Sequence, residues 1–232
     1  MQSHLLLIGN AYFEMDEDSK MNVTGMAYKF GSNTGKGFDN NMGASYAGQG
    51  GTDLDNPSDL TYGEFFQIPN DQQLHNYQMG SGGGSEDKRG GGVIVIQVRA
   101  ATIRGEILAN GAPSSTKVSK SFNAGSGGYI YIKCTISVCI INNYVKANGG
   151  YGSDDRQSNS GSGGRLVFNN VKFDNDERYS AYGGCSNNPT SSVYNGAAGT
   201  IYNEDTGKLM IRHNTRCVAS GRTVIKLSNA NN

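Results

Sequence analysis

The chain has 232 residues, among them 34 glycines and 25 asparagines, and it contains no tryptophan. Lysine plus arginine equals aspartate plus glutamate at 20 each, so the net charge is zero, which argues against a nucleic-acid partner because phosphate binding needs an excess of cations. No apolar run approaches the about 20 residues of a membrane-spanning helix, and the glycines lack the three-residue period of collagen.

Residues 1–42 are predicted to form a degenerate first coil with short strands at 5–8 and 21–28. The apolar start is too short for a signal peptide and an acidic run follows it, so the chain is either cytosolic or an internal piece of a longer, processed protein. We favour the second interpretation. Asn22-Val23-Thr24 is then a candidate glycosylation site, since this sequon is used only in secreted proteins.

Residues 43–90 are predicted to be a glycine-rich loop insertion. Asp53, Asp55 and Asp59 present alternating oxygens of the kind that Ca²⁺ prefers, but the segment lacks the glycine and glutamate of an EF-hand loop. A turn stabilised by side-chain hydrogen bonds is the favoured explanation. The glycines at 80–84 are not followed by the Gly-Lys-Ser/Thr of a phosphate loop. We expect no cofactor, with calcium as the weaker alternative.

A repeat dominates the rest of the chain. A Gly-Gly pair followed by four strand-forming residues occurs at 91–96, again at 127–132 and again at 163–168, each 36 residues apart, and a further step of 36 reaches Gly199. Equal spacing of this kind indicates a repeat protein. The predicted coils are 91–126, 127–162, 163–198 and 199–232, which form one continuous domain with the segments before them.

Each unit begins with an alternating, β-branched strand and continues with a second strand at 102–107, in which Ile103 and Ile107 face inward. If equivalent strands stack, two files of inward residues form along the axis: Ile94, Ile130 and Leu166, and Ile96, Ile132 and Phe168. A sandwich or propeller would need hairpin signals, whereas the Asn-Gly pairs recur at equivalent positions. We predict an all-β fold, a right-handed parallel β-helix with repeats of 36 residues and long Gly/Asn/Ser loops.

The Asn-Gly pairs at 110–111 and 148–149 are expected to form left-handed corners, with the asparagine side chains hydrogen-bonded along the axis. Tyr129 and Tyr131 alternate with the inward isoleucines and are expected to point outward. There they would either bind sugars or a partner protein, or be covered by the long loops. Two more strands are predicted at 208–212 and 223–227.

The four cysteines allow three pairings. Cys134 and Cys139 are close enough to bridge a turn within one coil, and Cys185 and Cys217, 32 residues apart, could join adjacent coils. We favour these two disulfides over four free thiols.

Catalytic constellations are sparse. The three histidines, His4, His75 and His213, are far apart, so neither a histidine metal site nor a Ser/His/Asp triad is indicated. The carboxylate clusters lie in or beside the Gly/Ser loops: Asp154 and Asp155, and Asp174, Asp176 and Glu177. A glycosidase needs two carboxyl groups facing one groove, and solvated loop acids are the favoured explanation here.

Residues 43–51, Tyr62-Gly63, residues 80–84 and residues 90–94 form a glycine-rich block. This block, with the repeats after it, resembles large glycine-rich parallel β-helix surface proteins of eukaryotes, abundant in ciliates and other protists and also present in plants. The resemblance runs from Val23 to Tyr202; it departs at Ala47, where the family usually has glycine, and in a lengthened segment around 65–77. It implies a very large, secreted or membrane-anchored surface protein without a known catalytic role.

We therefore expect a non-catalytic structural or adhesive module of an extracellular or cell-surface assembly, whose partners are other segments or subunits, protein or glycan. The alternative is a carbohydrate-binding or carbohydrate-cleaving β-helix, with Asp154, Asp155 or Arg156 aligned in a groove beside exposed tyrosines. An ice-binding solenoid is disfavoured, because Thr102, Thr135 and Thr200 do not recur in register.

Overall fold

The computed structural model describes residues 4–28, 43–48, 50–51, 78–83, 88–114, 123–152, 159–185, 195–215, 217 and 223. Within these residues the protein is all-β with parallel sheets, as predicted, and the sole helical element is the three-residue 3-10 helix η2 (Asp176–Arg178). The candidate calcium ligands Asp53, Asp55 and Asp59 lie outside the described residues.

Three sheets share the strands. Sheet A contains, in spatial order, β1 (His4–Ile8), β4 (Val93–Val98), β7 (Tyr129–Cys134), β10 (Arg165–Asn169), β13 (Thr200–Asn203) and β14 (Lys208–Met210). Sheet B contains β2 (Tyr12–Met15), β5 (Ala100–Ile103), β8 (Cys139–Ile141) and β11 (Val171–Phe173). Sheet C contains β3 (Lys20–Asn22), β6 (Glu106–Leu108), β9 (Val145–Lys146) and β12 (Tyr179–Ser180).

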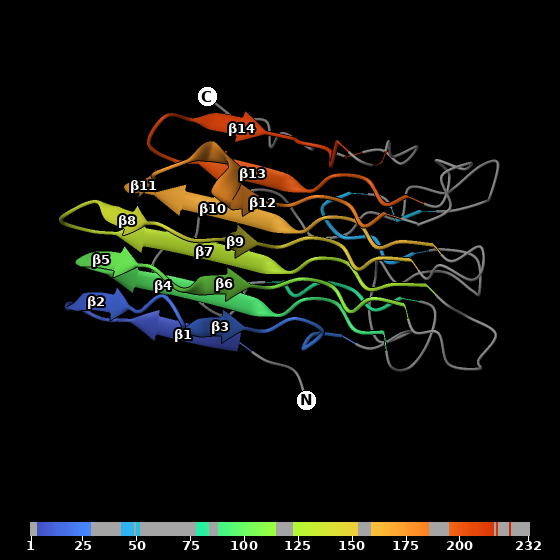
Figure 1. Cartoon of the computed structure of the whole chain (residues 1–232), viewed down its shortest axis with the longest axis horizontal. Helices are drawn as coiled ribbons and strands as arrows, with labels where there is room; N and C mark the ends of the chain where they lie inside the picture. Colours follow the sequence, from blue (N-terminus) through green and yellow to red (C-terminus); the bar gives the residue numbers. More distant parts are fainter. Residues whose placement is uncertain are drawn as a thin grey trace, which may run out of the picture.

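The chain visits the sheets in the order A, B, C four times, and each strand pairs in parallel with the corresponding strand of the next pass (Figure 1). β13 then begins a fifth pass, and β14 turns back to pair with β13 antiparallel. The strand predicted at 208–212 is thus present as β14. Of the strand predicted at 223–227, the structure describes Thr223 alone, in an antiparallel bridge with Gly48.

The predicted files of inward residues are confirmed by the register of sheet A. Ile94 pairs with Ile130 and Ile130 with Leu166, while Ile96, Ile132 and Phe168 form the neighbouring file. The next step is 35 residues, since Leu166 pairs with Ile201. The expected equivalence of Gly199 with Gly163 is therefore wrong by one residue: pairing of Arg165 with Thr200 places Gly199 level with Gly164.

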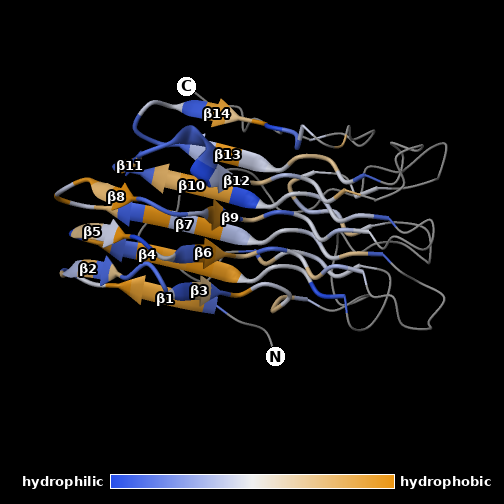
Figure 2. Ribbon diagram, in the orientation of Figure 1, coloured by the Kyte–Doolittle hydropathy of each residue, from blue (hydrophilic) through white to orange (hydrophobic). Residues whose placement is uncertain are grey.

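The inward side chains form one apolar core. The second strand predicted at 102–107 is two strands, β5 and β6, separated by a corner at Arg104 and Gly105, and both Ile103 and Ile107 are fully buried as expected. Burial of each such side chain stabilises the fold by about 1.5–3 kcal/mol. Apolar residues accordingly concentrate on the strands, while the connecting segments are paler or polar (Figure 2).

The outer face of sheet A is also buried. Tyr129 and Tyr131 expose only 7% and 2% of their surface and pack with Val93, Val95 and Val167 of the same sheet. Ala27 and Met79, from segments outside the strands, join this second cluster. The tyrosines therefore do not form exposed ladders. The alternative, that loop segments cover them, is confirmed.

The described parts of the glycine-rich connections stack in register beside the sheets. The Gly111 amide donates to Asn148 of the next pass at 2.9 Å, and the Gly125 amide donates to Ala112 of the same pass at 3.0 Å. Gly150 in turn donates to Gly125 at 2.9 Å. These segments thus bond both within one pass and between passes, which satisfies backbone groups that would otherwise be buried without partners.

The predicted left-handed Asn-Gly corners are wrong. Among the described residues only Gly25, Gly207 and Asn170 have positive φ. Gly111 is required for a different reason: a Cβ atom there would lie closer than 3.0 Å to carbonyl oxygens of the neighbouring segment. The glycines permit close backbone packing.

Residues 43–48 and 78–83, from the predicted insertion, lie against this stack. The Ala44 amide donates to Ala124 at 3.0 Å, its carbonyl accepts from Ser162 at 2.9 Å, and the Ser81 carbonyl accepts from Ser126 at 3.1 Å. Ser45, Ser81 and Tyr46 are buried. The described parts of the insertion are therefore integral to the packed structure.

Candidate functional site

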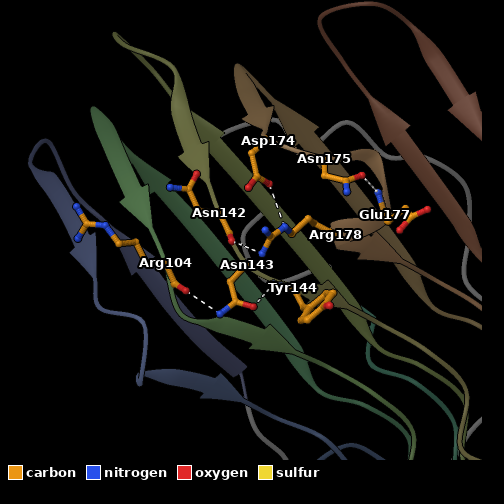
Figure 3. A network of polar contacts seen from close by, with 8 residues as sticks. All are labelled: Arg104, Asn142, Asn143, Tyr144, Asp174, Asn175, Glu177 and Arg178. Atoms are coloured by element: carbon orange, nitrogen blue, oxygen red, sulfur yellow. Dashed lines mark hydrogen bonds and ion pairs between the residues drawn. The ribbon is translucent and has the colours of Figure 1, made fainter.

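A network of polar contacts lies at the corner where sheet B passes into sheet C (Figure 3). This corner is built from the short connections between β5 and β6, between β8 and β9, and between β11 and β12. Because the passes stack in register, equivalent corners lie side by side and their side chains form rows along the axis.

Tyr144 is the aromatic centre of the corner and is 40% exposed. Lys146 Nζ lies 3.8 Å from the centre of its ring, and the Arg178 guanidinium carbon lies 5.9 Å away. Cations at these distances are attracted by the ring's negative face. The phenol ring is therefore held in place by two cations rather than by apolar packing alone.

Arg178 joins two passes. Its Nε lies 3.1 Å from the Asp174 carboxylate, and its NH1 donates to the Asn142 carbonyl of the preceding pass. Asn143 makes the next link, donating from Nδ2 to the Arg104 carbonyl at 2.8 Å; these links are drawn in Figure 3. The row continues to Glu14, which accepts from Arg104 NH1 at 2.8 Å and whose hydrogen bond and charge raise the pKa of Arg104. Polar contacts thus run across four passes.

The predicted acid cluster at 174–177 surrounds η2. Asp174 binds Arg178, and Asp176 lies 3.7 Å from Arg212 NH2 and accepts a hydrogen bond from the Tyr179 hydroxyl at 3.2 Å. Burial, and secondarily the charge of Asp176, raise the pKa of Tyr179. Asn175 caps η2 by accepting from the Glu177 amide at 2.9 Å. These contacts tie the acids to the architecture of the corner.

The second candidate cluster, Asp154, Asp155 and Arg156, lies outside the described residues, as does His75. His4 starts β1 and His213 follows β14, so the structure does not bring these two together. Among the described residues no three His, Cys, Asp or Glu side chains gather as a metal site. No described helix is long and apolar enough to cross a membrane.

The glycosylation candidate Asn22 ends the edge strand β3 and its side chain is exposed. Its Oδ1 accepts a hydrogen bond from the Thr24 amide at 2.9 Å. The hydroxyl of Thr24 accepts in turn from the Asn110 amide at 3.3 Å. The sequon therefore forms a compact turn on the surface, and its modification stays a prediction.

Both favoured cysteine pairs are disulfide-bonded in the structure. Cys134 and Cys139 join the end of β7 to the start of β8 across one turn, with Cα atoms 5.6 Å apart. Cys185 and Cys217, with Cα atoms 5.8 Å apart, tie the segment after β12 to the segment after β14. No described cysteine is left as a free thiol.

Sequence reasoning did not single out Tyr144 or Arg178. A signal was present: each lies one residue before an inward residue of sheet C, Val145 and Tyr179, so both occupy the same outward row. Lys20 and Glu106 occupy this row in the first two passes and form a 2.8 Å ion pair.

Comparison of the chain with models of protein families, with curated proteins and with solved structures gives no match.

Proposed function

We propose that the protein is a non-catalytic structural or adhesive module of a large extracellular or cell-surface assembly, built as a right-handed parallel β-helix. The observation that carries the proposal is the path of the chain, which passes through sheets A, B and C four times in the same order with its side chains in register. The right hand follows from the strong preference of parallel crossover connections.

The end of the stack formed by the first pass supports assembly. β1, β2 and β3 are the edge strands of sheets A, B and C, and all three lie at the same end (Figure 1). Edge strands present backbone donors and acceptors that readily pair with another strand. A further coil, from the same kind of protein or a partner, would continue all three sheets there.

The two disulfides support an extracellular location, since such bonds persist mainly in oxidising compartments. The exposed Asn22 turn supports it as well. The tight stacking of the glycine segments gives a physical reason for the glycine-rich block, and it supports a module built of stacked coils.

The test is expression through the secretory pathway of a eukaryotic cell, followed by peptide mapping without reduction and electron microscopy. We expect both disulfides, a glycan on Asn22, and end-to-end linear particles. Lysine in place of Leu6, which is 47% exposed on β1, should shorten the particles because charged edge residues oppose strand pairing. Free thiols in the secreted protein, or release of reducing sugars from polysaccharides, would overturn the proposal.

A carbohydrate-binding or carbohydrate-cleaving protein is the second candidate. The exposed aromatic ring of Tyr144 favours this second candidate. It lies beside Asn142, Asn143 and Arg178, and sugars bind to aromatic rings that are flanked by hydrogen-bonding groups. The test is a glycan array with wild type and Tyr144→Ala. Tyr12→Ala is the matched control, because Tyr12 is 60% exposed and begins β2, outside this corner. Binding lost only in Tyr144→Ala would favour this candidate.

A further inference from the structure

One outward row of sheet A places an amine, an amide and a carboxylate on successive strands. Lys133, near the end of β7, pairs with Asn169, the last residue of β10. Glu204 follows β13 directly, and its backbone amide donates to the Phe168 carbonyl at 2.8 Å, so it continues the row beside Asn169. Tyr131 lies two residues before Lys133 and therefore on the same face, which is the buried outer face of sheet A.

The carboxylate of Glu204 reaches back across β10. Its Oε2 accepts a hydrogen bond from Asn169 Nδ2 at 2.7 Å and from the Tyr131 hydroxyl at 3.4 Å. Tyr131 belongs to β7, the strand that also carries Lys133, so the carboxylate spans the distance between the two strands. Its other oxygen, Oε1, is shielded from solvent and has no hydrogen-bond partner among the described residues. This oxygen is an acceptor for an ammonium group brought beside it.

The strand ends that carry the row are held in register. Asn170 Nδ2 donates to the Cys134 carbonyl at 3.1 Å, and the Asn170 amide donates to the Asp205 carboxylate at 2.6 Å. These three residues directly follow the three members of the row. Neighbouring strands lie about 4.8 Å apart, and the flexible four-carbon stem of lysine spans that distance. The Lys133 amine can therefore reach the Asn169 amide carbon without movement of the backbone.

We infer that Lys133 and Asn169 form an isopeptide bond, an amide bond between the two side chains, with Glu204 as the acid and base. Lys133 Nζ attacks Asn169 Cγ, so that the Nζ–Cγ bond forms and the Cγ–Nδ2 bond breaks. The attacking ammonium nitrogen loses two protons, which pass through the Glu204 carboxylate to Nδ2. Nδ2 then leaves as an ammonium ion, and no oxidant, reductant or further reactant is needed.

The surroundings of the row favour this reaction. Glu204 already contacts Nδ2, the nitrogen that must gain protons in order to leave. The row borders Tyr131 and Val167, which expose only 2% and 4% of their surface, so few water molecules compete with the amine for the amide carbon. An amine and an amide fixed on adjacent strands also react as parts of one molecule, which raises their effective concentration by orders of magnitude.

A second lysine–asparagine pair lacks the carboxylate and serves as an internal comparison. Asn203 pairs with Lys208 where β13 turns back into β14. The side-chain oxygen of Asn203 accepts from the amide and the hydroxyl of Thr206, and no carboxylate of a described residue accepts from its amide nitrogen. Lys208 is exposed. We expect this pair to stay unreacted.

The first experiment is mass spectrometry of the full chain after reduction of its disulfides. We expect a mass about 17 Da below that of the sequence, because one ammonia is lost. In the unfolded chain trypsin should fail to cut after Lys133, and a branched peptide should join residue 133 to residue 169. A chain of full mass that trypsin cuts after Lys133 would overturn the inference. The same mass loss without the branched peptide would overturn it as well.

Three variants identify the reacting groups. Lys133→Arg keeps the positive charge but removes the amine, so it should keep the full mass. Glu204→Gln keeps an acceptor oxygen for Asn169 but cannot carry protons, and it should also keep the full mass. Lys208→Arg is the matched control and should lose ammonia as wild type does. Cross-linking in Glu204→Gln, or its absence in Lys208→Arg, would contradict the assignment. Near-ultraviolet circular dichroism of each variant checks that its fold is retained.

The bond would join the third and fourth passes covalently, next to a disulfide that lies within the third pass. It needs no particular compartment and goes beyond the proposed function, so the two fail separately. Linear particles built from chains without the cross-link would refute the isopeptide bond and leave the proposed function standing. A cross-linked chain that forms no linear particles would do the reverse.

Discussion

The side-chain oxygen of Asn110 accepts a hydrogen bond from the backbone amide of Asn148, one pass further along the stack, at 2.8 Å. Asn148 repeats the contact with the Tyr182 amide, also at 2.8 Å. The axial hydrogen bonding expected of these asparagines is therefore confirmed, although each side chain bonds to the next backbone rather than to the next side chain. Each bond fixes the register of one pass on its neighbour.

Replacing Asn110 with alanine should leave the Asn148 amide without a partner. An unsatisfied backbone donor in a partly buried position costs about 1–3 kcal/mol, so the free energy of unfolding should fall by that amount in urea titrations. Asn110→Asp keeps an acceptor oxygen and should lose less. Asn10→Ala is the control, because Asn10 is exposed, and it should change the free energy of unfolding little. If Asn110→Ala and Asn110→Asp lose equal stability, the assigned hydrogen bond is contradicted.

Gly111→Ala should destabilise the protein by about 3 kcal/mol or more, because the added methyl group collides with backbone that cannot move aside. Gly9→Ala is the matched control, since nothing lies within 4 Å of a Cβ atom at Gly9. Its effect should stay within about 0.5 kcal/mol. Thermal unfolding of both variants checks the difference, and similar melting temperatures would count against close packing at Gly111.

The two disulfides should contribute unequally. Cys134 and Cys139 close a loop with a sequence separation of 5, whereas Cys185 and Cys217 are separated by 32. Loop entropy in the unfolded chain then predicts about 2 kcal/mol for the first and about 4 kcal/mol for the second. Paired cysteine-to-alanine variants, unfolded in urea, provide the comparison. A larger loss for the Cys134–Cys139 pair would contradict the entropic account.

Stability should fall at high pH through Tyr46. Burial raises the pKa of Tyr46 from 10.0 to about 12, against a smaller opposing effect of Arg165. The folded protein therefore keeps this proton between pH 10 and about 12 while the unfolded chain has lost it, so the free energy of unfolding decreases as pH rises through this window.

Unfolding at about pH 9 to 12, compared between wild type and Tyr46→Phe, measures the effect. The phenylalanine variant loses the 2.8 Å bond to the Gln78 carbonyl, yet its stability should depend less steeply on pH. If the unfolding free energies of the two proteins change with pH in parallel, the pKa of Tyr46 is not raised in the folded protein.

The strands were predictable because their signals are local. Inward and outward residues alternate at 91–96, and the same pattern recurs 36 residues later. This is enough to identify Ile94 and Ile130 as equivalent positions. The cysteine pairs were predictable from their sequence separations. Cys134 and Cys139 are 5 residues apart, which suits a turn within one pass, and Cys185 and Cys217 are 32 apart, which is close to one repeat. The step to Ile201 was not, because the connections differ in length from pass to pass: Tyr179 pairs with Val145, a step of 34 residues, whereas Leu166 pairs with Ile130, a step of 36.

What covers Tyr131 could not be predicted, because the covering residues come from elsewhere. Met79 belongs to a segment without apolar periodicity that sequence reasoning interpreted as loop, and its role depends on long-range backbone contacts. The corner around Tyr144 was missed because its partner Arg178 meets it only after the passes are stacked, which no local pattern reveals.

The glycine stack also has a thermodynamic consequence. Unfolding exposes peptide groups there and little apolar surface, and exposure of polar groups lowers the heat capacity whereas exposure of apolar groups raises it. This part of each pass therefore offsets the heat-capacity increase from the isoleucine core. We expect the protein to have a smaller heat-capacity change on unfolding, and a stability that varies more gently with temperature, than a globular protein of equal length.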